Sequence, residues 1–162
     1  MIDRTEFIRA NTALVSPPLV PEIKLHLATE VVPLWQLTEE ELAAQGIPPP
    51  YWAFAWAGGQ ALSRYVLDHP EIVKSKSVLD FGSGSGLVAI AAAKAGADRV
   101  MAADIDDFAQ ATIKLNAAAN GAIVSTTTTD LIDSDGNWRI ILVGDMCYER
   151  PLAERLLSWL TE

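Results

Sequence analysis

From residue 51 onward, short apolar runs alternate with longer segments in which apolar residues recur at three- and four-residue intervals. Short apolar runs are typical of buried strands, and the longer interval is typical of helices with one buried face. Strands that alternate with helices predict a parallel, doubly wound α/β sheet, because each helix returns the chain to the same end of the sheet. The predicted strands are residues 77–81, 99–104, 124–129 and 140–143. The predicted helices are residues 57–68, an alanine-rich segment that ends at 95, 107–120 and 152–160.

The chain divides into two unequal parts, because the first 50 residues are less regular and end in three prolines that favour an extended backbone. Residues 1–50 are expected to form a helix and hairpin extension that packs on a domain at residues 51–162. The elements expected in this extension are a helix from Asp3 to about Ala13, a strand at residues 23–27 paired with residues 31–35, and a short acidic helix that begins at the capping box 38–41 and ends at Gly46.

Composition narrows the classes of function. Half of the 162 residues are hydrophobic and a fifth are charged, which is typical of a packed domain. The 21 acidic residues exceed the 12 basic ones and give a net charge of −9, so we expect no nucleic-acid partner, since a phosphate backbone is held by clustered Lys and Arg. One cysteine and two histidines argue against a disulfide framework and a zinc site. With no export signal and no apolar run long enough to span a membrane, the expectation is a cytoplasmic protein.

The strongest chemical signal lies between the strand at 77–81 and the helix that follows it. Asp80-Phe81-Gly82-Ser83-Gly84-Ser85-Gly86 has glycines at GxGxG spacing after an acid, whereas the dinucleotide fingerprint GxGxxG needs glycine where this chain has Leu87. Such a turn lets the backbone pass beneath a nucleoside, and an adjacent carboxylate attracts a cation. S-adenosylmethionine has an ammonium group and no phosphate, so Asp80 favours it over a dinucleotide. The alternatives are a nicotinamide-dependent oxidoreductase and a tight turn without a ligand.

Three further acids follow the predicted strands. Asp104 ends the second strand, 24 residues after Asp80, where a carboxylate can accept hydrogen bonds from both hydroxyls of a ribose. Asp106 is expected to cap the next helix. Asp130 follows the third strand, where the edge of an adenine would lie, and its alternative role is that of a plain loop acid.

Four segments of the sequence resemble a known family. VLDFGSGSGLVAIAAAKAGADRVMAADID resembles motif I and the acidic strand end of the seven-β-strand, S-adenosylmethionine-dependent methyltransferases. PYWAFAWAGGQALSRYVLDHPE and ILVGDMCYERPLAERLLSWL resemble the electron transfer flavoprotein β-subunit lysine methyltransferases, which are members of the family-16 group of protein methyltransferases. PLVPEIKLHLATE is similar to their N-terminal region. The resemblance implies a Rossmann-like fold of the class I methyltransferase type and a protein lysine N-methyltransferase activity.

The resemblance also implies roles for individual residues. Asp145-Met146-Cys147-Tyr148 fits the acid-x-x-aromatic motif that borders the substrate lysine in this group, so Asp145 would orient the amine and Tyr148 would form a wall of the lysine channel. The alternatives are a helix N-cap for Asp145 and a core aromatic for Tyr148. The residues expected to bind S-adenosylmethionine are Trp56, Asp80, Gly82, Ser83, Gly84, Gly86, Asp104, Ile105, Asp130 and Gly144.

The implied protein substrate is the β subunit of electron transfer flavoprotein. The alternative substrates are a ribosomal stalk protein, another protein or a small molecule. A further alternative is that the chain is an inactive fragment that only binds the cofactor. The family's sheet has three more strands after the fourth strand and its helix, but this sequence stops at Glu162, so residues 51–162 are expected to be a C-terminally incomplete domain. The apolar strand at 140–143 would then be an exposed sheet edge, which favours self-association.

Overall fold

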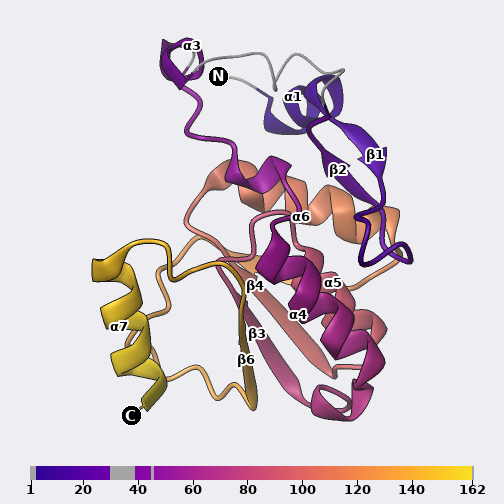
Figure 1. Cartoon of the computed structure of the whole chain (residues 1–162), viewed down its shortest axis with the longest axis vertical. Helices are drawn as coiled ribbons and strands as arrows, with labels where there is room; N and C mark the ends of the chain where they lie inside the picture. Colours follow the sequence, from indigo (N-terminus) through magenta and orange to yellow (C-terminus); the bar gives the residue numbers. More distant parts are fainter. Residues whose placement is uncertain (1–2, 30–38, 45, 162) are drawn as a thin grey trace.

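The computed structural model describes residues 3–29, 39–44 and 46–161, and a parallel sheet of four strands lies at its centre (Figure 1). Neighbouring strands pair in parallel, as the sequence pattern predicts, and β6 (Ile140–Val143) is an edge strand of this sheet. The opposite edge strand, β5 (Ser125–Thr127), is shorter than predicted. The bounds of β6 and of β3 (Ser77–Phe81) agree with the prediction. In the order in which they lie side by side, the strands are β5 (Ser125–Thr127), β4 (Arg99–Ala103), β3 (Ser77–Phe81) and β6 (Ile140–Val143).

The helices of this region begin and end close to their predicted positions. Gly96 follows the second of them with a φ of +90°, the left-handed conformation that favours glycine at a helix end. Asp106 precedes the third and accepts a hydrogen bond of 2.8 Å from the backbone N–H of Phe108, which confirms its predicted capping role. The helices are α4 (Ala57–Asp68), α5 (Leu87–Lys94), α6 (Asp107–Ala119) and α7 (Arg150–Thr161), with short 3-10 helices η1 (Tyr51–Ala53) and η2 (Pro70–Ile72).

Alternate side chains of the strands enter two apolar layers, one on each face of the sheet. Val78 and Val100 pack on one face with residues of α4, α5 and α6. Leu79 and Phe81 pack on the other face with Leu156 of α7. Figure 1 shows α7 on one side of the sheet and α4 with α5 on the other. Both faces of the central strand β3 are therefore buried, and all five of its residues are buried, including the polar Ser77 and Asp80.

The N-terminal extension differs in part from its prediction. Asp3 caps the first helix, as predicted, by accepting hydrogen bonds from the N–H groups of Thr5 and Glu6. The predicted strand is confirmed over its last three residues, but its partner is a short strand that the sequence pattern did not predict, and the expected partner at 31–35 lies outside the described residues. The first helix ends before Ala13 because that strand begins there. The elements are α1 (Arg4–Asn11), β1 (Ala13–Val15), β2 (Leu25–Leu27) and α3 (Glu39–Ala44).

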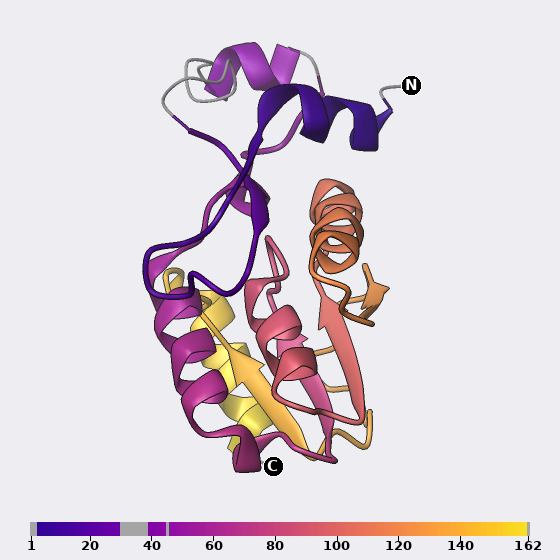
Figure 2. The ribbon, with the colours of Figure 1, turned by 90° about the vertical axis from the view of Figure 1, so that its right-hand side faces the viewer.

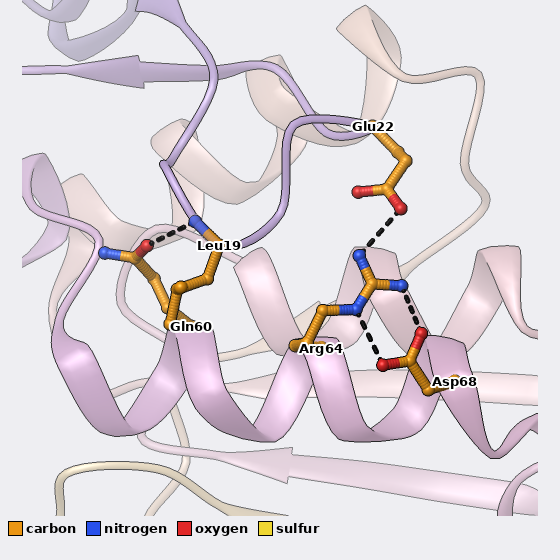
Figure 3. Close-up of polar contacts among 5 residues, drawn as sticks. All are labelled: Leu19, Glu22, Gln60, Arg64 and Asp68. Carbon is orange, nitrogen blue, oxygen red and sulfur yellow. Dashed lines mark hydrogen bonds and ion pairs between the residues drawn. The ribbon is translucent and has the colours of Figure 1, made fainter.

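Polar side chains of α4 hold one loop of the extension. Arg64 donates hydrogen bonds to the carboxylates of Glu22, at 2.7 Å, and Asp68, while Gln60 accepts the N–H of Leu19 at 3.3 Å (Figure 3). These contacts link two segments that are about 40 residues apart in the sequence. They fix the loop that precedes β2 on the outer surface of α4.

Asn116 of α6 joins the extension to the glycine turn. Its side chain is fully buried, its Oδ1 accepts the N–H of His26 at 2.7 Å, and its Nδ2 donates to the carbonyl of Ser85 at 2.8 Å. Figure 2 shows the extension, in indigo and violet, beyond the end of the sheet toward which the strand arrows point. The extension thus lies next to the end of the sheet where the predicted site residues are. Among the helices in the described part of the chain, none is long and apolar enough to cross a membrane.

Candidate cofactor-binding and active site

A cavity of about 620 Å³ opens at the carboxyl ends of the strands. This volume lies in the range of small-molecule sites, and the position is the one at which α/β sheets bind ligands. Gly86 is expected at this site but does not line the cavity. Eleven of the twelve residues that the sequence assigns to the site line it: Trp56, Asp80, Gly82, Ser83, Gly84, Asp104, Ile105, Asp130, Gly144, Asp145 and Tyr148.

The glycine turn forms the floor of the cavity. The N–H groups of Gly82 and Ser83 donate to the carbonyl of Ala103 at 2.9 and 3.0 Å, so the turn is fixed to the end of β4. Gly86 instead serves helix packing, because it has a φ of +82° and a Cβ there would lie 3.3 Å from the side chain of Ile113. The first two glycines therefore shape the cavity, and the third brings α5 close to α6.

Asp80 lies beneath this turn with 1% of its surface exposed. Its Oδ2 accepts hydrogen bonds from the hydroxyl of Ser83 at 2.6 Å and from the N–H of Ala89 at 3.0 Å. Burial raises the pKa of Asp80 to about 7; the charge of Asp104 adds to the rise, and the two donors oppose it. The carboxyl group therefore titrates near neutral pH, and a cation in the cavity would favour its ionised form.

Asp104 presents its carboxylate to the same cavity from the end of β4. One oxygen accepts the N–H of Gly84 at 2.8 Å and the other accepts the N–H of Asp106 at 3.0 Å. Burial raises the pKa of Asp104, and these two hydrogen bonds act in the opposite direction. A carboxylate has about four acceptor positions, so each oxygen can accept a further hydroxyl from a ligand.

Asp130 lines the cavity, but its carboxylate also has partners within the protein. Arg155 of α7 donates to it at 3.0 Å, and the N–H of Ile132 donates at 3.1 Å. Partial burial acts to raise the pKa of Asp130, but these two donors lower it overall. Arg155 was not predicted from the sequence, because nothing in a helical pattern indicates which loop an exposed arginine will reach.

Three exposed aromatic side chains surround the mouth of the cavity. The ring centroid of Tyr51 lies 6.2 Å from that of Trp56 and 6.4 Å from that of Tyr148. The Nε1 of Trp56 donates to the carbonyl of Tyr51 at 2.9 Å, which holds the indole at the rim. Tyr148 is 63% exposed, so the alternative of a core aromatic is wrong. Tyr51 was missed as a site residue, although it follows three prolines that lead the chain to the rim.

Asp145 follows β6 and contacts the beginning of α4. Its two carboxylate oxygens accept the N–H groups of Gly58 at 3.0 Å and Gly59 at 2.6 Å. Asp145 therefore caps a helix, as the alternative interpretation proposed. The capped helix is α4, which is distant from Asp145 in the sequence. Asp145 also lines the cavity next to Tyr148. The structure therefore gives this acid two neighbours, the cavity and the helix.

Comparison with known proteins agrees with this geometry. The family model described as "Ribosomal protein L11 methyltransferase (PrmA)" matches residues 60–141. An electron transfer flavoprotein β-subunit lysine methyltransferase from Mus musculus is 43% identical over 95% of this chain and 60% of its own length. A homologue of that enzyme from Caenorhabditis elegans is 39% identical over 93% of this chain and 67% of its own length. The chain belongs to the family of the electron transfer flavoprotein β-subunit lysine methyltransferases. It spans about 60% of the length of the mouse relative.

Solved structures of methyltransferases share the fold. The ribosomal protein L11 methylase of Lactobacillus delbrueckii subsp. bulgaricus is 35% identical, with a TM-score of 0.52 over 64% of this chain and 51% of that chain. The magnesium protoporphyrin IX methyltransferase of Synechocystis, solved with bound S-adenosylmethionine, has a TM-score of 0.52 over 63% of this chain and 50% of that chain, at 23% identity. The second likeness concerns the fold alone. Because the chain belongs to a methyltransferase family, the alternative prediction of a nicotinamide-dependent oxidoreductase is wrong.

The chemistry of the cavity fits the cofactor of such a family. None of the lining residues that the structure describes is Lys, Arg or His, whereas Asp80, Asp104, Asp106, Asp130 and Asp145 all line it. A pyrophosphate would meet repulsion there, and a cationic nucleoside without phosphate would not. The acidic residues and the glycine floor therefore suit a ligand such as S-adenosylmethionine.

Proposed function

We propose that this chain binds S-adenosylmethionine in the cavity and methylates a lysine side chain of a protein, the β subunit of electron transfer flavoprotein. The observation that carries the proposal is the combination of a glycine floor with five acids and, among the lining residues that the structure describes, no base. The substrate part rests on the relatives, which are named for this reaction and are about 40% identical over almost the whole chain.

Different residues of the cavity would contact different parts of the cofactor. Asp104 would accept the ribose hydroxyls, and the glycine floor would admit the ligand to close backbone contact. Asp80 would favour the cationic amino-acid end of the ligand through its charge. Ile105 and Asp130 would contact the adenine. When bound, S-adenosylmethionine supplies an electrophilic methyl group on a sulfonium ion.

The substrate lysine must react as a neutral amine, because only a free lone pair can attack a methyl group. With a reference pKa near 10.4, only about 0.1% of lysine is neutral at pH 7.4. The rings of Tyr51, Trp56 and Tyr148 at the mouth would displace water from the aliphatic stem and lower the pKa of the entering ammonium. The entering ammonium would first lose a proton to water, and the lone pair of the neutral amine would then displace sulfur from the methyl carbon, leaving a methylammonium on the lysine and a neutral thioether. In-line positioning would be the main contribution to the rate.

A protein substrate that carries lysines also fits the charge of this chain. The net charge of −9 would attract a basic segment and favour its encounter with the cavity. A second target is favoured by the L11 methyltransferase family model, which covers residues 60–141, and by the 35% identical L11 methylase structure. Ribosomal protein L11 is therefore the comparison substrate.

Transfer of tritium-labelled methyl groups tests the proposal. The chain, S-adenosylmethionine and either the flavoprotein β subunit or ribosomal protein L11 are incubated, and the labelled amino acid is identified after acid hydrolysis. We expect methyl-lysine in the flavoprotein subunit, and much less of it at limiting S-adenosylmethionine when Asp104 is replaced by alanine. Methyl-lysine in L11 alone would assign the second target. A folded chain that binds the cofactor and labels neither protein would contradict the proposed substrate.

A further inference from the structure

The loop after β6 and the first turn of α4 interlock at the mouth of the cavity. The carboxylate of Asp145 receives the N–H groups of both Gly58 and Gly59. A Cβ at Gly58 would lie 2.6 Å from Oδ1 of Asp145, and a Cβ at Gly144 would lie 3.2 Å from the Cα of Gly59. A Cβ at Gly58 would force the carboxylate of Asp145 to move, and one at Gly144 would push on the backbone of Gly59, so glycine on each side lets the two segments approach closely.

Helix α4 has no cap of its own. Its N-cap residue is Trp56, whose side chain makes no capping hydrogen bond and instead binds the carbonyl of Tyr51. The first N–H groups of a helix need acceptors, and a negative charge beside them is favoured by the helix dipole. Asp145 supplies the acceptor and the charge from a distant part of the sequence.

The backbone of Asp145 is also in an uncommon conformation. Its φ is +56°, in the left-handed region that residues other than glycine rarely adopt. Such a conformation is retained when the surrounding contacts require it. Here it follows the glycine at position 144 and directs the carboxylate back toward α4.

We infer that Asp145 is a positioning residue: its contact with the first turn of α4 fixes Tyr148 relative to Tyr51 and Trp56 and so sets the shape of the cavity mouth. The inference rests on the proposed function for its consequence in catalysis. The rings belong to the two segments that the interlock joins, since Tyr51 and Trp56 precede α4 and Tyr148 follows Asp145. The direct contact with the substrate lysine that the family resemblance implies would need the charge of Asp145, whereas positioning needs its hydrogen-bond acceptors.

Three variants separate these two roles. Asp145→Asn keeps one of the two acceptor oxygens that face the first turn of α4, loses the other, and removes the charge. Asp145→Ala removes both. Gly58→Ala leaves the acid in place and breaks the interlock from the side of α4. Each is measured for melting temperature, for binding of S-adenosylhomocysteine by calorimetry, and for kcat and KM of lysine methylation.

If Asp145 positions the mouth, the alanine variant melts about 2–4 °C lower and binds S-adenosylhomocysteine about fivefold more weakly. Gly58→Ala behaves in the same way, and the double variant is no worse than the more affected single one, because both changes break one contact. Asp145→Asn falls between the wild type and the alanine variant in melting temperature, binding and kcat, because it keeps one of the two acceptors.

Two results would overturn the inference. One is an alanine variant that melts and binds as the wild type does; the other is an asparagine variant that binds normally but has lost turnover as completely as alanine, which would show that the charge is what matters. Failure of the proposed function is seen separately, as absence of binding or of methyl-lysine with the wild-type chain. The comparison of melting temperatures stands in either case.

Discussion

Two carboxyl groups in one cavity differ in what surrounds them. Asp80 is fully buried and both of its donors bind the same oxygen, whereas Asp104 shares its two oxygens between two backbone N–H groups and still faces the cavity. Sequence spacing after strands places both acids at the same edge of the sheet. It does not reveal which one is covered, because that depends on how Ser83 folds over the turn.

Protonation of Asp80 should make the stability of the chain depend on pH. Its pKa is about 7 in the folded chain against 3.8 for the free group, so between these values the folded chain holds a proton that the unfolded chain releases. The free energy of unfolding therefore falls as pH rises from about 4 to about 7, by an amount on the order of a few kcal/mol, and the contribution is constant above that range. Urea unfolding at a series of pH values measures it.

Asp80→Asn is the matched control for this pH dependence. The asparagine oxygen can accept from both Ser83 and Ala89, because the native partners use a single oxygen. The variant should lose most of the decline in stability between pH 4 and 7, while the raised pKa values of Asp104 and Asp106 leave a smaller residual slope. An identical slope in the variant and the wild type would assign the pH dependence to other groups.

Some residue contacts were within reach of the sequence and others were not. Asp3 and Asp106 were predicted as caps because a cap and its helix are adjacent in the chain. The bond between Arg155 and Asp130 and the contact of Asp145 with α4 join segments 25 and about 87 residues apart. Their geometry depends on the assembled fold, so no local pattern indicates it.

Helix and strand boundaries were also predictable where the signals are local in the sequence, and not where they depend on the assembled fold. The bounds of α4, β3 and β6 agree with the prediction because helical periodicity, continuous apolar runs and terminal proline or glycine all point to the same positions. The pairing of β1 with β2 was missed, since a three-residue strand carries almost no periodicity. Tertiary contacts select that pairing, and asparagines of α6 supply two of them.

Asn116 is expected to be the more important of these asparagines. Replacement by alanine would leave the N–H of His26 and the buried carbonyl of Ser85 without their partners, at a cost of about 2–3 kcal/mol in the free energy of unfolding. Asn120→Ala is the control, because Asn120 binds the backbone of Lys24 at a more exposed position and should cost about 1 kcal/mol. Urea unfolding of both variants measures the difference. Equal losses would show that the buried bridge to the glycine turn adds nothing.

At the scale of the whole molecule, the topology explains why the site residues meet. The carboxyl ends of parallel strands lie at the same end of the sheet. Residues that follow β3, β4, β5 and β6 therefore gather there, although they are far apart in the sequence. This gathering was predictable from the alternation of strands and helices. In the wall formed by residues 48–56 only Trp56 was predicted, from the family resemblance, because prolines and aromatics in a loop do not by themselves indicate which surface the loop will cover. Self-association through the edge strand β6 and the division of the chain at residue 50 stay predictions.

Ligand binding should protect one end of the molecule and not the other. A second cavity of about 580 Å³ lies near the amino ends of β4 and β5 and includes Lys94 and Arg99 in its wall. Hydrogen exchange with S-adenosylhomocysteine should slow the amides of residues 80–86, 104–106 and 144–148 and leave residues 121–125 unchanged. Protection of 121–125 alone would place the ligand at the second cavity, which would contradict the proposed site.

The most direct test of the account is calorimetric titration of the wild-type chain and of Asp104→Ala with S-adenosylhomocysteine. We expect one binding site per chain and affinity at least about tenfold weaker in the alanine variant, because the ribose would lose two hydrogen bonds to a charged acceptor. Asp104→Asn, which keeps one acceptor oxygen, should fall between the two. Absence of binding by a folded wild-type chain, or equal affinity in the wild type and Asp104→Ala, would contradict the claim that this cavity holds the cofactor.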